Sequence, residues 1–300
     1  MTDQKTKGIS CVMFENHRIM RKMAFPAAIL LLLLFVCSFS IAQKKSYESD
    51  YAKDWKLVFS DEFDKTDGSQ PDSSIWQRCV RRKARWDRWI SNSKSVVYIK
   101  DGKLVCRAIP NREAKRDTAQ MLTGAVDTRS TVSFQYGKIE VRMRTNAKPG
   151  NFPAIWLLPK QPAAPHPFSG EIDIVEFYGL QPDAYHTAHT NWTLNLKQTD
   201  NPPHQFHEKV SPTEWHVYGL VWDKKHLAWY VDGKFVGAYK RKKTKKARKG
   251  GQWPFDHPFY VVLNQSVGDG TWRRYGAKEP ILTDTYETEI DYVRIYKREK

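Results

Sequence analysis

Apolar and polar residues alternate in short runs along most of the chain from residue 43 onward. A period of two is typical of β-strands with one buried face. It predicts strands at residues 55–59, 96–99, 104–106, 137–143, 217–222, 227–231 and 292–296. Asp101-Gly102 and Asp232-Gly233 each come directly after such a run. An Asp-Gly pair at this place predicts a two-residue hairpin turn. Few windows show helical periodicity, so we expect an all-β domain with two antiparallel sheets packed face to face.

The N-terminal segment has a different pattern. A nearly continuous apolar run occupies residues 24–41, two basic residues precede it, and the small residue Ala42 follows it. This order is typical of a secretory signal peptide. We therefore divide the chain into residues 1–42, an N-terminal extension and signal peptide, and residues 43–300, a single domain of a secreted, periplasmic or cell-surface protein. An uncleaved membrane anchor is the alternative, because the run barely reaches the length that spans a bilayer.

Composition narrows the class of protein further. The chain carries 49 Lys and Arg against 33 Asp and Glu, a formal net charge of +16, and 13% of its residues are aromatic. That aromatic content excludes an intrinsically disordered protein, and four cysteines exclude a disulfide-dense scaffold. After cleavage only Cys79 and Cys106 remain, and an oxidising compartment would allow them to pair. Cys37, inside the apolar run, is a candidate for lipidation.

The positive charge is concentrated in two segments. Residues 240–249 carry eight Lys or Arg in ten positions, and residues 78–88 carry six. A solvated loop that keeps the protein soluble is one interpretation of these segments. A sulfated or otherwise anionic glycan is the second, because Lys and Arg pair well with such groups. Nucleic-acid binding is the third, and the signal peptide argues against it.

Three carboxylates lie close together in Glu171-Ile172-Asp173-Ile174-Val175-Glu176. On a regular strand Glu171 and Asp173 share one face and Glu176 points to the other. A β-bulge at Ile174-Val175 would accommodate one extra residue and return Glu176 to the first face. Repulsion and burial would then raise the pKa of one acid while its neighbour stays ionised, which is the division of roles that glycoside hydrolysis needs. A surface strand or a metal site is the alternative.

This segment and its surroundings resemble glycoside hydrolase family 16, a family of secreted laminarinases, agarases, carrageenases and endo-galactanases. Residues 171–176 match the bulged form of the family's active-site motif. Further matches follow in order at residues 61–63, 136–140, 152–159, 187–189, 253–256, 258–260 and 291–296. The resemblance implies a β-jelly-roll sandwich with a substrate cleft across its concave sheet, and a monomeric, retaining endo-β-glycanase that needs no cofactor for its chemistry. It also implies that Glu171 is the nucleophile, Glu176 the acid/base, and Asp173 the acid that positions and tunes the nucleophile.

The same resemblance implies further binding residues. Those at the sugar are Trp156 as an aromatic platform, Arg129 at the border of the cleft, His189 beside the acid/base, Asn264, Gln265 and His166. Only one of the two adjacent amides can point inward. Core packing is the alternative for Trp156 and His189, and a plain surface position is the alternative for Arg129. Glu62, Gly102 and Asp291 match a structural calcium site on the convex side of many members, and a salt bridge is the alternative for these acids.

Departures from the family pattern bear on the substrate. Laminarinase-like members have Trp-Pro where this chain has His166-Pro167, so a flat indole suited to stacking on a glucan is missing. The stretch at residues 189–192, together with Gln265, is closer to galactan-cleaving relatives. We therefore expect a polysaccharide or glycan substrate that contains galactose, with or without sulfate, and no nucleic-acid partner. An endo-β-1,3-glucanase is the first alternative. A non-catalytic lectin is the second, but it would not need three acids aligned by a bulge.

Overall fold

The computed structural model describes residues 41–113, 115–268, 270–271, 275 and 278–299. Residues 44–300 form one compact unit, and residues 1–43 form another. The apolar run up to residue 40 and Cys37 within it lie outside the described residues. In the part of the chain that is described, no helix combines the length and the apolar character needed to cross a membrane.

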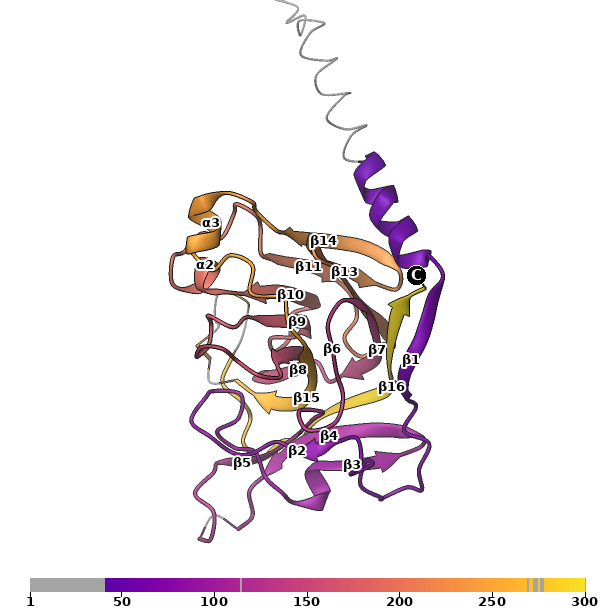
Figure 1. The fold of residues 1–300 in the computed structure, drawn as a ribbon. Coiled ribbons are helices and arrows are strands. Elements are labelled where there is room, and N and C mark those ends of the chain that lie inside the picture. Colours follow the sequence, from indigo (N-terminus) through magenta and orange to yellow (C-terminus); the bar gives the residue numbers. More distant parts are fainter. Residues whose placement is uncertain (1–40, 114, 269, 272–274, 276–277, 300) are drawn as a thin grey trace, which may run out of the picture. The chain divides into compact units, whose positions relative to one another are not determined.

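Two antiparallel sheets make up residues 55–298 and confirm the predicted all-β sandwich (Figure 1). The first contains β1 (Trp55–Asp61), β3 (Val97–Lys100), β4 (Lys103–Pro110), β7 (Gly137–Thr145), β12 (His216–Trp222), β13 (His226–Val231), β14 (Lys234–Lys240) and β16 (Tyr286–Arg298). The second contains β2 (Gln77–Arg78), β5 (Met121–Asp127), β6 (Ser133–Phe134), β8 (Asn151–Pro159), β9 (Glu171–Glu176), β10 (Asp183–His189), β11 (Gln205–Lys209) and β15 (Phe259–Val267). The β4–β5 pair joins the two sheets into one nearly closed jelly roll.

Helices are few and short. They are η1 (Lys94–Val96), α2 (Asn191–Leu194), α3 (Lys245–Lys249) and the helical residues that end at position 52. Within the compact unit, Tyr47 of the last segment stacks on Phe235, and Tyr51 lies 4.3 Å from the ring of Tyr230. Tyr47 and Tyr51 therefore pack against β13 and β14.

The hairpin turns and the alternation follow the sequence prediction. Lys100 pairs with Lys103 across Asp101-Gly102, whose φ angles are 52° and 64°. Two consecutive positive φ angles are what a tight turn between twisted strands requires. On β7 the side chains of Ile139 and Val141 are buried in the core between the sheets. The intervening polar side chains point outward, as a period of two dictates.

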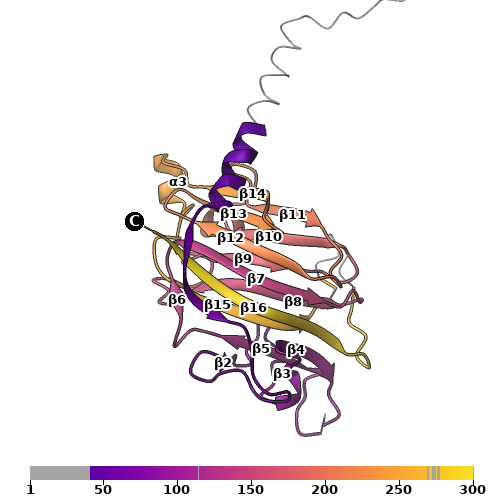
Figure 2. The same cartoon turned by 90° about the vertical axis from the view of Figure 1, so that its right-hand side faces the viewer.

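The last strand, β16, lies in the middle of its sheet, between β4 and β7 (Figure 2). Its outward acids alternate along the strand and meet arginines of both neighbours. Glu287 pairs with Arg107 at 3.2 Å, Glu289 with Arg144 at 2.9 Å, and Asp291 with Arg142 at 2.6 Å. Opposite charges on neighbouring strands stabilise the register in which β16 pairs with β4 and β7.

Candidate active site

The predicted bulge is present on β9. Opposite β8, Asp173 pairs with Trp156 and Val175 pairs with Ile155, so one extra residue of β9 fits between two adjacent positions of β8. The register of β9 against β10 shifts at the same place. Ile174 and Val175 are both fully buried in the core. The bulge therefore returns Glu176 to the face that carries Glu171, and both line one cleft.

Glu171 stands at the start of β9, in contact with His166 and near His189. Nε2 of His166 lies 2.8 Å from its Oε2, and the Glu171 side chain is 18% exposed. Burial by itself would raise the pKa of Glu171. The hydrogen bond from His166, the charges of His189 and His166, and a hydrogen bond to Asp173 outweigh it and hold that pKa below its ordinary value. Glu171 is therefore suited to act as an ionised carboxylate.

Asp173 is almost fully buried between its neighbours. Nε2 of His189 lies 3.0 Å from its Oδ2, and Nε1 of Trp229 donates a 2.8 Å hydrogen bond to its backbone carbonyl. Burial, followed by the charge of Glu171, raises the pKa of Asp173 well above its ordinary value. A protonated Asp173 can donate its hydrogen bond to Glu171, which is the tuning role that the sequence predicted for it.

The pKa of Glu176 is shifted in the opposite direction to that of Glu171. Its side chain is buried, and burial together with the charge of Asp173 raises its pKa well above the ordinary value. The hydroxyl of Tyr178 donates a 2.9 Å hydrogen bond to its Oε2. Glu176 is therefore suited to hold a proton that a leaving group needs. Sequence reasoning missed Tyr178, although extending the alternation two residues past Glu176 would have placed it on the same face.

The cleft has a volume of about 1060 Å³ and crosses the concave sheet. Its lining comes from residues 82–87, from β8 to β10 and β15, and from residues 193–205. Trp156 and Asn264 both line it, and Nε1 of Trp156 donates a 2.8 Å hydrogen bond to Oδ1 of Asn264. Trp86, which the sequence analysis did not single out, meets the Trp156 ring edge-on at 4.8 Å. His166 and His189 also line the cleft.

Two predicted sugar ligands lie elsewhere. Gln265 is fully buried between the sheets, where its Oε1 accepts a 2.6 Å hydrogen bond from Thr288 and its Nε2 donates to Asn151 at 2.8 Å. Of the adjacent amides, Asn264 is the one that faces the cleft, and the prediction for Gln265 was wrong. Arg129 lies over the ring of Tyr260 at 5.1 Å and pairs with Asp127 at 3.4 Å, outside the lining of the cleft.

The residues of the predicted calcium site do not fit that ion. Both carboxylate oxygens of Glu62 accept hydrogen bonds from Arg294, at 2.9 and 2.7 Å. Asp291 pairs with Arg142 at 2.6 Å, and Gly102 lies in the β3–β4 turn. A cation would have to displace two guanidinium groups that already carry positive charge, so the salt-bridge alternative describes these acids. Among the described residues, only Glu171, Asp173 and His189 bring three ligand atoms within 4.8 Å of one another, and these are the candidate catalytic groups.

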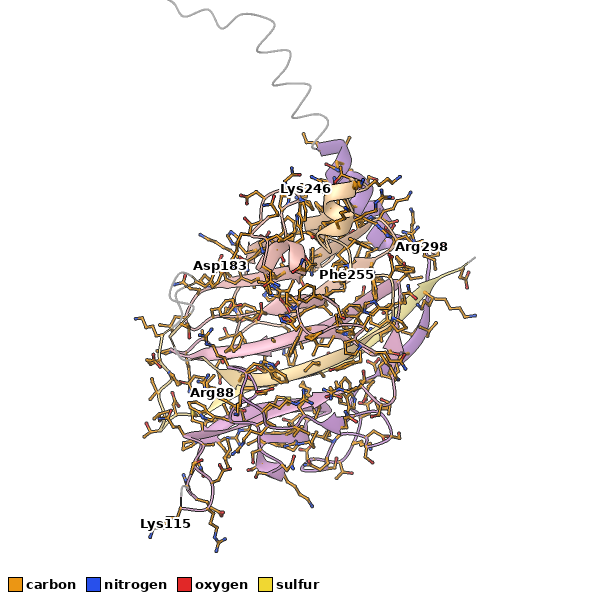
Figure 3. The ribbon with its side chains drawn as sticks, turned by 60° about the vertical axis from the view of Figure 1, so that its left-hand side comes forward. Arg88, Lys115, Asp183, Lys246, Phe255 and Arg298 are labelled. Atoms are coloured by element: carbon orange, nitrogen blue, oxygen red, sulfur yellow. The ribbon has the colours of Figure 1, made fainter. Side chains whose placement is uncertain are left out.

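The structure also places the two cysteines and the two basic segments. Cys79 and Cys106 are both buried and unpaired, Cys79 under the cleft beside Trp156 and Cys106 in the core between the sheets. In Figure 3, Lys246 of the run 240–249 lies near the top of the molecule and Arg88 of the other segment lies at its lower left. Within the described part of the chain, the run contributes no residue to the cleft lining, whereas Arg82 and Arg85 do.

Comparison with known proteins assigns the chain to a family. The family model described as glycosyl hydrolases family 16 matches residues 88–294. A beta-glucanase of Rhodothermus marinus is 30% identical over 93% of this chain and 96% of its own length. The chain belongs to glycosyl hydrolase family 16. The predicted class of enzyme, a hydrolase of O-glycosyl bonds, is confirmed by this membership.

Other relatives differ in what their names say they act on. The glucan endo-1,3-beta-glucosidase A1 of Niallia circulans is 31% identical over 81% of this chain, which spans 38% of that protein. The keratan-sulfate endo-1,4-beta-galactosidase of Sphingobacterium multivorum is 31% identical over the same share of this chain, which spans 56% of that protein. Among solved structures, the laminarinase from Rhodothermus marinus superposes with a TM-score of 0.72 at 28% identity, covering 82% of this chain and 99% of that one.

Proposed function

We propose that this family 16 protein is a retaining endo-β-glycanase in which Glu171 is the nucleophile and Glu176 the acid/base. The observation that carries the proposal is that two carboxyls of one strand line one cleft in surroundings that shift their pKa values in opposite directions. The two histidines lower the pKa of Glu171, while burial raises the pKa of Glu176. Retaining hydrolysis needs this pair, because one group must attack carbon while the other donates a proton.

In the first step a Glu171 oxygen attacks the anomeric carbon. The bond between that carbon and the glycosidic oxygen breaks, and the proton of Glu176 passes to the departing oxygen. Asp173 donates its hydrogen bond to Glu171, which positions the attacking carboxylate. The product of this step is a sugar ester on Glu171 and a released chain end.

In the second step water attacks the same carbon from the side that the leaving group has vacated. Glu176, now ionised, takes a proton from that water, and the ester bond to Glu171 breaks. Two displacements at one carbon restore the original configuration. Glu176 ends the cycle protonated and Glu171 ionised, as at the start.

The proposed substrate is a β-1,3- or β-1,4-linked polysaccharide or glycan that contains galactose and carries sulfate. The name of the Sphingobacterium relative supports this class. So do His166 at the position of the stacking indole, and the side chains of Arg82, Arg85 and Lys197 in the cleft lining. A β-1,3-glucan is the second candidate, supported by the names of the Niallia and Rhodothermus proteins. Export of the enzyme is part of the proposal and rests on residues 21–42.

Two experiments test the function. Reducing-sugar release is measured on laminarin, lichenan, agarose, porphyran, keratan sulfate and mucin glycans, and we expect the highest rate on a galactose-containing member. A higher rate on laminarin would favour the second candidate, and no release from any of them would contradict the proposed activity.

The roles of the two glutamates are separated by azide rescue. With an activated aryl glycoside of the preferred sugar, Glu176→Ala plus azide should give a β-glycosyl azide, because azide replaces water on the sugar ester. Glu171→Ala plus azide should give the α-glycosyl azide, because azide then attacks the intact substrate directly. The reverse pattern, read by NMR, would exchange the two assignments.

A further inference from the structure

The loop before β9, which carries His166, is closed by its own hydrogen bonds. The Ser169 hydroxyl accepts a 3.0 Å hydrogen bond from the backbone N–H of Ala164 and donates at 2.8 Å to the carbonyl of the same residue. Gly170 has a φ angle of +83°, and a Cβ there would lie 2.8 Å from Pro254 and 2.9 Å from Phe255. Only glycine fits this backbone and this contact. The loop therefore closes on itself and presents His166 to the cleft.

His166 is placed against the nucleophile and not against the other acids. Its Nε2 is 2.8 Å from Oε2 of Glu171, and half of its side chain is exposed. The ring of His189 lies 6.5 Å away and contacts Asp173 instead. Each histidine thus contacts a different carboxyl, and His166 is the one that contacts Glu171.

We propose that His166 is a positioning residue that orients the Glu171 carboxylate in the free enzyme. When substrate enters the cleft, His166 releases Oε2 of Glu171, which can then attack the anomeric carbon. The inference rests on the proposed nucleophile role of Glu171. Its own content is that a half-exposed histidine, at a position where laminarinase-like members carry an indole, controls the nucleophile.

The need for such a partner follows from the charges around Glu171. The groups that face it are Asp173 and Glu176 on its own strand, His189 on β10 and His166 on the loop. Burial disfavours a negative charge at Glu171, whereas the histidines and a hydrogen bond from Asp173 favour it. Of the two histidines, His166 is the one that contacts the Glu171 carboxylate directly, because His189 contacts Asp173. A donor at 2.8 Å also fixes the rotamer of the carboxylate.

The test compares His166→Phe, which removes the donor, with His166→Gln, which restores a neutral donor. His207→Phe is the matched control, because His207 also pairs with a carboxyl, but with that of Asp183 on the neighbouring strands. The pH profile of kcat/KM is measured for each on the polysaccharide that the panel shows to be hydrolysed fastest. The acidic limb of this profile reports ionisation of the free enzyme's nucleophile. Thermal unfolding of each variant shows whether it is folded.

We expect the acidic limb to move upward by about one pH unit in His166→Phe, because an opposite charge in contact with a carboxyl lowers its pKa by about one to three units. Below the limb, kcat/KM should fall about tenfold, with a smaller change on the plateau. His166→Gln should lie between Phe and wild type, and His207→Phe should match wild type. A folded His166→Phe with an unmoved limb, whether or not its KM rises, would overturn the proposal. If Glu171→Gln keeps its activity, the nucleophile assignment itself is wrong, and this outcome is separate from the first.

Discussion

The phenol of Tyr178 donates its hydrogen bond to the carboxyl that must act as the acid, with 2.9 Å between Oη and Oε2 of Glu176. Burial and the charge of Glu176 raise the pKa of Tyr178 well above its ordinary value, so the hydroxyl remains a donor throughout the working range of pH. A donor stabilises the ionised form of Glu176 and opposes the effect of burial. Tyr178 thus limits how far burial raises the pKa of Glu176.

Replacing Tyr178 by Phe should shift the basic limb of kcat/KM upward by about one pH unit, since one hydrogen bond to a charged group has about that effect. The sign follows because loss of the donor raises the pKa of Glu176, which must be protonated for the first step. The acidic limb, which reports Glu171, should stay where it is. A basic limb that moves downward would show that Tyr178 does not act on the ionised form of Glu176.

Deletion of Val175 removes the bulge. Glu171, Asp173 and the shifted glutamate would then alternate regularly, with Ile172 and Ile174 still directed into the core. We expect a folded protein with reduced activity, destabilised by about 2 kcal/mol because a buried side chain is lost. Thermal unfolding and kcat measure the two effects separately. An unfolded product would mean that neighbouring strands require the bulge.

Charge in the cleft and charge outside it should have different effects on an anionic substrate. We expect Arg82→Gln with Arg85→Gln to raise KM for keratan sulfate by up to roughly tenfold and to leave KM for a neutral polysaccharide unchanged, since each exposed contact contributes about 0–1 kcal/mol. The increase should shrink with added salt. Serine at Lys243, Lys245, Lys246 and Lys249 is the matched control, because these exposed lysines lie outside the cleft lining. Equal effects of both variants would contradict a specific role for the cleft arginines.

Removal of calcium should not change stability. Arg294 already binds both oxygens of Glu62, so treatment with a chelator should leave the Tm unchanged. Glu62→Gln breaks the ion pair and should cost about 1 kcal/mol or less, because both side chains are about one-third exposed. A large drop in Tm with chelator, restored by calcium, would show that the ion competes successfully with Arg294.

Alternation along the chain predicted the strands, the hairpin turns and the bulge, because each depends on neighbours in sequence. It predicted the shared face of Glu171, Asp173 and Glu176 for the same reason. Alternation also shows that Asn264 and Gln265 point to opposite faces, but only the pairing of β15 with β8 and β5 tells which face is concave.

The rest depends on contacts between distant segments. Glu62 and Arg294 are 232 residues apart in sequence, and no local pattern predicts which cation an exposed acid will meet. Trp86 reaches Trp156 because its loop crosses the sheet, and the course of such a loop follows from tertiary packing. The two cysteines are separated for the same reason, one under the cleft and one between the sheets.

The central position of β16 has a consequence for how the chain is assembled. The strands on both sides of it, β4 and β7, are made long before it, yet they reach each other only through it. Until residue 298 is available, β4 and β7 present open hydrogen-bonding edges on either side of a gap, and Arg107, Arg142 and Arg144 lack their acids. Pairing over such sequence separations is slow. The sheet therefore closes only when β16 pairs with both of its neighbours, and this pairing is the step that commits residues 55–298 to the folded state.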